Sequence, residues 1–265
     1  MSTDPLSIQA RGITDVGQRR DHNEDAFLVD EGVGLFIVAD GMGGHAGGGT
    51  ASTLAVETIR SAVAHAREHE PERFGSTGAD DTRVPDLLRD AVEEACEVIF
   101  RTAQADPDLS GMGTTVTAVL VDGATAFVAH VGDSRCYLIR EGRIYQVSED
   151  HSLVNEQLKA GAISADEART SRFKNIITRS VGFEQQVVVD LMGLDLEPGD
   201  ALVVCCDGLS NLVDDPEILS IVSESPIDLA PGRLVALAND RGGDDNITVI
   251  VVRTTKAKGE PLRSG

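Results

Sequence analysis

Short runs of β-branched and other apolar residues, each ended by glycine or aspartate, recur along this chain. Such runs are typical of β-strands, because branched side chains pack well on a pleated surface and Gly or Asp favours the turn that follows. The turn pairs Asp122-Gly123 and Glu141-Gly142 fall between runs and indicate antiparallel hairpins. We predict seven strands: Gly34–Ala39, Thr114–Val121, Thr125–Val131, Cys136–Arg140, Val187–Leu191, Ala201–Cys206 and Ile247–Val252.

Apolar residues at helical spacing interrupt the strand pattern in the first half of the chain, as at Leu87, Leu88, Ala91 and Ala95. The polar segment Glu70–Pro85, rich in Gly, Asp and Thr, is expected to be a mobile loop between two long helices. We predict long helices at Gly48–His69 and Asp86–Ala105, and shorter ones at Leu153–Ala160, Asp215–Ser223 and Asp228–Asp240.

Clusters of strands accompanied by paired helices indicate an α+β fold with four layers. In this α/β/β/α sandwich, two mainly antiparallel sheets pack face to face with the helices outside. A length of 265 residues suits one domain of this kind. We assign residues 1–254 to a single domain and residues 255–265 to a polar tail that is expected to fray.

The chain is strongly acidic, with 44 acidic against 23 basic residues and a formal charge of -21. Such a surface repels nucleic acid and anionic lipid, so neither is an expected partner. Most of the charge serves solubility, but carboxylates also attract divalent cations. No apolar run approaches the ~20 residues that span a bilayer, and Met1–Ala10 lacks the features of a signal peptide. We therefore expect a cytoplasmic protein with buried, unpaired cysteines.

Aspartates recur where predicted strands end. Asp40, Asp133 and Asp207 each follow a strand, and Asp245 precedes the last one. A single Asp-Gly after a strand is usually only a turn. Four such carboxylates converging on one edge of a sandwich would need a neutralising partner. Oxygen ligands favour Mg²⁺ or Mn²⁺ over zinc, so the pattern predicts a site for these ions.

A second polar segment near the N-terminus mixes Glu24 and Asp25 with Arg19 and Arg20. If the acids extend the metal site, a neighbouring arginine is placed to hold a phosphate through its planar fork. The alternative interpretation of this segment, taken alone, is a surface cluster of ion pairs.

Eight blocks of sequence, in this order, resemble the PPM family of metal-dependent protein serine/threonine phosphatases (the type-2C class) in its compact bacterial form. The resemblance covers roughly Ile8 to Arg253. The blocks are Asp15-Val16-Gly17 with Arg20 and Asn23-Glu24-Asp25; Ala39-Asp40-Gly41-Met42-Gly43-Gly44-His45; Gly111-Met112-Gly113-Thr114-Thr115; His130-Val131-Gly132-Asp133-Ser134-Arg135; Asp150-His151-Ser152; Asn175 with Thr178-Arg179; Cys206-Asp207-Gly208-Leu209; and Asp245-Asn246-Ile247-Thr248.

The resemblance implies a catalytic centre with two Mn²⁺ or Mg²⁺ ions. By position, Asp40 would bridge both ions and the Gly41 carbonyl would bind one of them, while Asp207 and Asp245 complete the other. A water or hydroxide shared by the two ions would attack phosphorus directly, without a covalent phosphoenzyme.

The same resemblance assigns secondary roles to three further acids. Glu24 and Asp25 would act mainly through metal-bound waters. Asp133, together with Asp207, matches the site of a weaker third metal seen in bacterial members.

The resemblance also implies how substrate is held. Arg20 matches the residue that binds the substrate phosphate, with Arg19 as its competitor. Residues 150–182 match the family's flap beside the active site. Met42 stands where eukaryotic relatives carry histidine, and His45 lies three residues further on, so the general acid stays unassigned.

The implied substrates are phosphoserine and phosphothreonine proteins, with a cognate Ser/Thr kinase as a natural partner, and we expect a monomer. A catalytically inactive binding protein and an enzyme for small phosphorylated metabolites are the alternatives. Cysteine-based phosphatases are excluded, because neither Cys205 nor Cys206 is followed six residues later by arginine.

Overall fold

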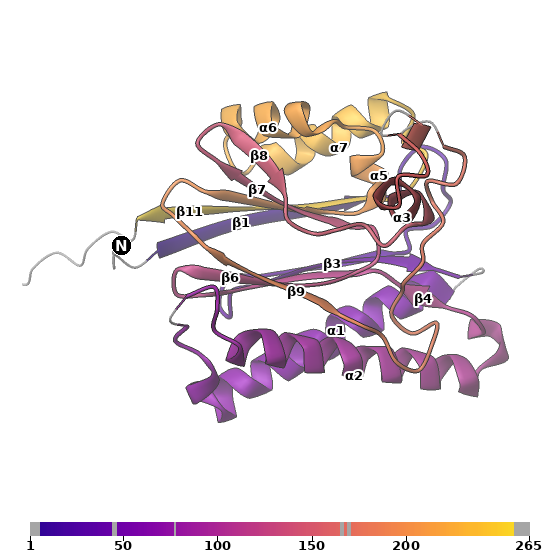
Figure 1. The fold of residues 1–265 in the computed structure, drawn as a ribbon, viewed down its shortest axis with the longest axis horizontal. Helices are drawn as coiled ribbons and strands as arrows, with labels where there is room; N and C mark the ends of the chain where they lie inside the picture. Colours follow the sequence, from indigo (N-terminus) through magenta and orange to yellow (C-terminus); the bar gives the residue numbers. More distant parts are fainter. Residues whose placement is uncertain (1–5, 44–46, 77, 165–166, 169–170, 257–265) are drawn as a thin grey trace, which may run out of the picture.

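Two antiparallel β-sheets pack face to face in the computed structural model, which describes residues 6–43, 47–76, 78–164, 167–168 and 171–256. Helices α1 and α2 cover one sheet, and α6 and α7 cover the other (Figure 1). The first sheet has the order β1-β11-β10-β7-β8, and the second has the order β2-β3-β5-β6-β9 with short β4 paired to β3. The α+β sandwich of four layers predicted from the sequence is confirmed.

The bounds of the elements follow the chain. The first sheet holds β1 (Leu6–Asp15), β7 (Arg135–Arg140), β8 (Arg143–Gln146), β10 (Ala201–Cys205) and β11 (Ile247–Lys256). The second holds β2 (Asp25–Asp30), β3 (Leu35–Met42), β4 (Gly113–Thr114), β5 (Val116–Asp122), β6 (Thr125–Val131) and β9 (Asp190–Asp195). The α-helices are α1 (Gly47–His69), α2 (Arg83–Ala105), α3 (Leu153–Lys159), α5 (Asp207–Ser210), α6 (Asp215–Glu224) and α7 (Ala230–Asp240).

Alternate residues of the central strands belong to two different apolar layers. On β3, Ile37 packs with the residues of α1 and α2, whereas Phe36 and Val38 belong to the layer between the sheets. On β10, Leu202 and Val204 belong to that same inner layer. This period of two decides which side chains point inward where each strand reaches the edge of the sandwich.

Several predicted boundaries were wrong. The strand predicted at Val187–Leu191 begins only at Asp190, and β1 and β2 were not predicted at all. β3 continues beyond Ala39 to Met42, because its last residues pair with β4. β11 continues to Lys256 because it pairs with β1 along its whole length, which places the start of the expected tail in a strand. Residues 257–265 lie outside the described part of the chain.

The segment between α1 and α2, expected to be a mobile loop, packs against the second sheet. Phe74 is buried under the guanidinium of Arg67, and the Ser76 amide donates to Asp122 at the end of β5. The final residues of the predicted loop are helical, because α2 begins at Arg83. No helix in the described ranges has both the length and the apolar character that crossing a membrane demands.

Candidate metal centre

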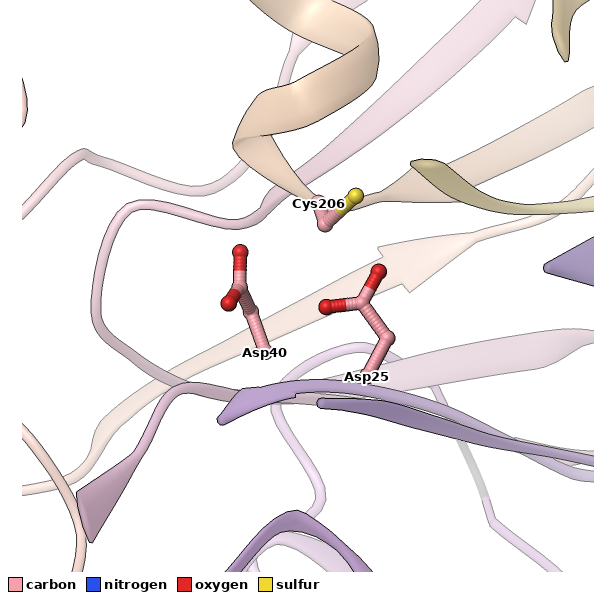
Figure 2. Close-up of side chains that lie close together, drawn as sticks. All are labelled: Asp25, Asp40 and Cys206. Carbon is pink, nitrogen blue, oxygen red and sulfur yellow. The ribbon is translucent and has the colours of Figure 1, made fainter. Parts of the chain in front are cut away.

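Asp25 and Asp40 stand directly opposite each other on the neighbouring strands β2 and β3. Asp40 shares the alternation of inward-facing Phe36 and Val38, so its carboxylate emerges at the edge of the layer between the sheets. Figure 2 shows both carboxylates pointing toward Cys206, which follows β10 on the opposing sheet. One ligand atom from each of these three residues lies within 4.8 Å of the other two.

Three more aspartates reach the same edge from other elements. Asp207 is the first residue of α5, and its side chain accepts a 3.0 Å hydrogen bond from Asn211 Nδ2. Asp245 lies two residues before β11, and Asp133 lies in the turn between β6 and β7. The charges of Asp25, Asp207, Asp133 and Asp245 all act on the Asp40 carboxyl. Both sheets thus deliver acids to one end of the sandwich, as the strand-end pattern predicted.

This crowding makes it hard for the carboxyl groups to ionise. Burial, reinforced by the charges of Asp207 and Asp245, raises the pKa of Asp25 to about 7. Burial and the charge of Asp207 raise the pKa of Asp133 to about 8. The pKa of Asp40 lies well above its ordinary value for the same two reasons, burial and neighbouring carboxylates. A cation at this edge would remove both the desolvation penalty and the repulsion.

Two buried oxygens at the site have no hydrogen-bond partner among the described residues, Oδ1 of Asp25 and Oδ1 of Asp133. Buried polar atoms are nearly always paired, so an unpaired carboxylate oxygen marks a place for a ligand. The other oxygen of Asp25 accepts a 2.6 Å hydrogen bond from Thr248 Oγ1, which fixes the carboxyl group in place. Oxygen donors that repel one another and lack partners fit hard divalent cations such as Mg²⁺ or Mn²⁺.

Gly41 brings its backbone close to two other segments. A Cβ atom added at this position would lie 2.1 Å from the Gly48 carbonyl oxygen and 2.5 Å from that of Glu24. Only glycine fits between these chains. The Glu24 amide in turn donates to Asn246 Oδ1 at 2.8 Å, so the residues next to the carboxylates are held by their backbones.

The structure brings Arg20 to the site and leaves Arg19 outside it. Arg20 Nη2 donates to Asp245 Oδ2 at 2.7 Å, and half of the Arg20 side chain is exposed. Within the described part of the chain, the acid that Arg19 approaches is Asp244, at 4.0 Å, with both side chains 72% exposed. Asp15, an acid with no proposed metal role, holds a turn by accepting a hydrogen bond from the Gly17 amide.

Cys206 is a site neighbour that sequence reasoning treated only as a buried thiol. It is fully buried, its Sγ accepts from the Thr248 amide at 3.0 Å, and it donates to the Asn246 carbonyl at 3.3 Å. The alternation along β10 could have revealed its direction, because Leu202, Val204 and Cys206 share one face. His45, which stands near the position of the unassigned general acid, lies outside the described residues.

A pocket of about 620 Å³ lies beside the carboxylates, between the flap and the start of α6. Asp133 and Asp207 form part of its lining, together with Asn155 of α3 and Lys174 of the flap. The carboxylate cluster is therefore open to this pocket on the side of the flap predicted at residues 150–182.

A family model described as protein phosphatase 2C matches residues 16–229. The chain belongs to the protein phosphatase 2C family. Its relatives include a putative protein phosphatase 2C-type from Streptococcus pyogenes, 40% identical over 243 residues that cover 90% of this chain and 94% of the relative. Protein phosphatase PhpP of Streptococcus pneumoniae is 38% identical over 253 residues, which cover 94% and 98% of the two chains.

Solved structures of 2C-type phosphatases have the same fold. The Streptococcus agalactiae serine/threonine phosphatase superposes with a TM-score of 0.82 at 38% identity, covering 93% of this chain and 99% of the other. The catalytic domain of the serine/threonine phosphatase PstP, solved with two manganese ions, gives 0.80 at 34% identity, covering 94% and 99%. The resemblance stated from the sequence blocks is confirmed, and with it the classification of this chain as a protein phosphatase.

Proposed function

We propose that this chain removes phosphate from phosphoserine and phosphothreonine residues of proteins with the help of two Mn²⁺ or Mg²⁺ ions. The observation that carries the proposal is the meeting of five aspartates from both sheets at one edge, two of which have a buried oxygen with no partner among the described residues. The residues that would hold the ions are Asp40, the Gly41 carbonyl, Asp207 and Asp245, with Glu24 and Asp25 acting mainly through waters and Asp133 contributing to a weaker third site.

Bound divalent ions supply Lewis-acid stabilisation of the phosphoryl oxygens and make a water nucleophilic at neutral pH. In the proposed reaction the water oxygen forms a bond to phosphorus, and the bond from phosphorus to the seryl or threonyl oxygen breaks. A proton then passes to the departing oxygen. No phosphoenzyme forms. Cys206, the thiol beside the carboxylates, is fully buried, and its Sγ already hydrogen-bonds to the Asn246 carbonyl and the Thr248 amide. Burial also raises the pKa of this thiol far above its ordinary value.

Arg20 is proposed to bind the substrate phosphate. Its guanidinium lies at the rim of the carboxylate cluster, and a single hydrogen bond, to Asp245, accounts for its polar contacts with the described residues. An arginine has five N–H donors in a planar fork, so the donors beyond the one on Asp245 can meet phosphate oxygens.

A phosphoprotein substrate is favoured over a small metabolite by the open pocket beside the centre and by relatives named serine/threonine phosphatase. An inactive binding protein is disfavoured because every acid that the family motif requires is present in the sequence. A Ser/Thr kinase that phosphorylates the same proteins is the partner we propose, in the cytoplasm.

The test compares a phosphothreonine peptide, a phosphoserine peptide and a panel of sugar and nucleoside phosphates, each with and without Mn²⁺. We expect Mn²⁺-dependent phosphate release from the peptides at kcat/KM values well above those for the metabolites. Preference for one metabolite would replace the proposed substrate class, and absence of release from every substrate would support the inactive alternative.

A further inference from the structure

His151 lies at the base of the flap, where the two ends of this segment meet. Its carbonyl accepts a hydrogen bond from the Thr178 amide at 2.9 Å, and the next residue, Ser152, forms a β-bridge with Ile177. The residue is 7% exposed. A buried imidazole at a chain junction needs polar partners for both ring nitrogens, and those partners reveal what it connects.

The ring joins two parts of the second sheet to the flap. Nδ1 accepts from the Gly132 amide at 3.0 Å, and Nε2 lies 3.1 Å from Asp190 Oδ2 on β9. A backbone amide can only donate, so Nδ1 carries no proton and Nε2 donates to Asp190. Arg179, at the far end of the flap, donates to the other oxygen of Asp190 at 2.6 Å.

Gly132 is also held by the backbone of the same histidine, because the His151 amide donates to the Gly132 carbonyl at 2.8 Å. It adopts φ +112°, and an added Cβ would lie 2.5 Å from Thr115 Cγ2, so its position is tightly confined. The residue that follows is Asp133, whose buried Oδ1 has no partner among the described residues. His151 therefore holds both polar groups of the backbone residue that leads into Asp133.

We propose that His151 is a positioning residue that couples the flap to the Asp133 turn, with Asp190 and Arg179 as its anchors. The ring holds Gly132 on one side and Asp190 on the other, and this support orients the turn that carries Asp133. The consequence for metal binding rests on the proposed function, whereas the mechanical coupling does not.

Two substitutions at the same position separate the two links. His151→Asn places an amide oxygen near the position of Nδ1 and keeps an acceptor for Gly132, but it cannot reach Asp190. His151→Gln places its amide near Nε2 and loses the Gly132 acceptor. Asp190→Ala removes the anchor on β9 without touching the ring. Lys159→Met, which removes only the exposed flap ion pair to Glu149, is the matched control.

The first measurement is amide hydrogen exchange of residues 131–135 and of the flap in the metal-free protein. We expect faster exchange of residues 131–135 in His151→Gln and Asp190→Ala. Exchange of the flap should be faster in these two variants and in His151→Asn, and Lys159→Met should show no change. Unchanged exchange of residues 131–135 in both His151→Gln and Asp190→Ala overturns the coupling. If His151→Gln does not fold, as judged by circular dichroism, Asp190→Ala decides.

The second measurement is Mn²⁺ binding by calorimetry, with Asp133→Asn as the reference for loss of the weak site. We expect the weak-site Kd to rise about tenfold or more in His151→Gln and by a smaller factor in His151→Asn, which keeps the Gly132 acceptor but loses the Asp190 anchor, since residues that orient a ligand tune metal affinity on this scale. If Asp133→Asn weakens Mn²⁺ binding and His151→Gln does not, the positioning role of His151 is overturned and the proposed function stands. If Asp133→Asn binds like the wild type, the metal role of Asp133 fails, while the exchange result still judges the coupling.

Discussion

Arg20 donates a 2.7 Å hydrogen bond from Nη2 to Oδ2 of Asp245. The proposed phosphate-binding residue and a proposed metal ligand are thus in direct contact, although 225 positions separate them in the chain. The contact holds the guanidinium at the rim of the carboxylate cluster, where a phosphate oxygen would arrive. Arg19, one residue earlier, points to Asp244 and into solvent.

Arg20→Ala is expected to raise KM for a phosphothreonine peptide about tenfold or more, because a charge-assisted hydrogen bond to phosphate contributes roughly 1.5–3 kcal/mol. Arg19→Ala is expected to change KM by less than about twofold, since exposed charges contribute little. Steady-state kinetics at saturating Mn²⁺ measures both. A larger effect in Arg19→Ala would show that the phosphate contact belongs to that residue.

Asp40→Asn is expected to lower kcat at least a hundredfold, on the order of the loss seen when a preorganised charge at a reaction centre is removed. The fold should survive, because the amide keeps the size of the side chain and relieves the repulsion from Asp25 and Asp207. The unfolding midpoint of the metal-free variant should match or exceed that of the wild type. A variant with wild-type kcat would rule out Asp40 as a bridging ligand.

Removal of divalent ions is expected to abolish activity reversibly. The donor set consists of carboxylate oxygens and one backbone carbonyl, so Mn²⁺ or Mg²⁺ should restore phosphate release after chelation with EDTA and buffer exchange. The measurement is phosphate release from a phosphothreonine peptide across a titration of each metal. Full activity in excess EDTA would contradict the metal-dependent mechanism.

The sequence pointed to most acids of the carboxylate cluster because they stand beside strands whose apolar runs are easy to recognise. Asp207 follows such a run, and Asp245 precedes another. Spacing alone could not show that these strands meet at one edge, because strand order depends on contacts between distant segments. The family resemblance supplied that step, and the sheet order then showed the convergence of the acids.

The missed elements have a physical reason. On β1, Ser7, Gln9 and Arg11 alternate with less exposed residues, so no continuous apolar run appears. β2 does contain a short apolar run, Ala26 to Val29, which the sequence pattern could have revealed. Cys206 was recognised as buried, but its proximity to Asp25 depends on the facing of two sheets, which no local pattern records. The His151 junction likewise depends on contacts with Gly132 and Asp190, 19 and 39 positions away.

The stability of the metal-free protein is expected to fall as pH rises from about 4 to 8. Asp25 and Asp133 have folded-state pKa values of about 7 and about 8, above the ordinary aspartate value of 3.8, so the folded state binds more protons across this window. Their favourable contribution is complete below pH 3.8 and is lost as pH passes through the raised values. His130 acts in the opposite sense: burial lowers its pKa from 6.5 to about 4, so its contribution is lost as pH falls through that range.

Comparison of Asp133→Asn with the wild type isolates the carboxylate contribution from that of the histidine. The free energy of unfolding of the variant should fall less steeply as pH rises. At pH 8 without metal it should exceed that of the wild type by on the order of 1–3 kcal/mol, since the substitution removes an uncompensated buried charge. Mn²⁺ should stabilise the wild type more at pH 8 than at pH 5, because it competes with protons. Urea unfolding at each pH checks these signs, and equal slopes for the two proteins would exclude Asp133 as a source of the dependence.

Gly41→Ala is expected to damage both stability and catalysis, because its Cβ would overlap the Gly48 and Glu24 carbonyl oxygens at 2.1 and 2.5 Å. Neither contact is with a flexible side chain, so β3 or the start of α1 must shift, and the Gly41 carbonyl shifts with it. We expect a loss of about 2 kcal/mol or more in the free energy of unfolding and weaker Mn²⁺ binding.

Gly49→Ala is the matched control on α1, because its Cβ would meet no atom closer than 3.8 Å and alanine favours a helix by about 0.5–1 kcal/mol over glycine. Calorimetric Mn²⁺ titration and urea unfolding of the two variants separate a requirement for glycine at position 41 from a general intolerance of alanine in this segment. If both variants lose equal stability and equal Mn²⁺ affinity, the close approach at Gly41 is not what fixes the position of the Gly41 carbonyl.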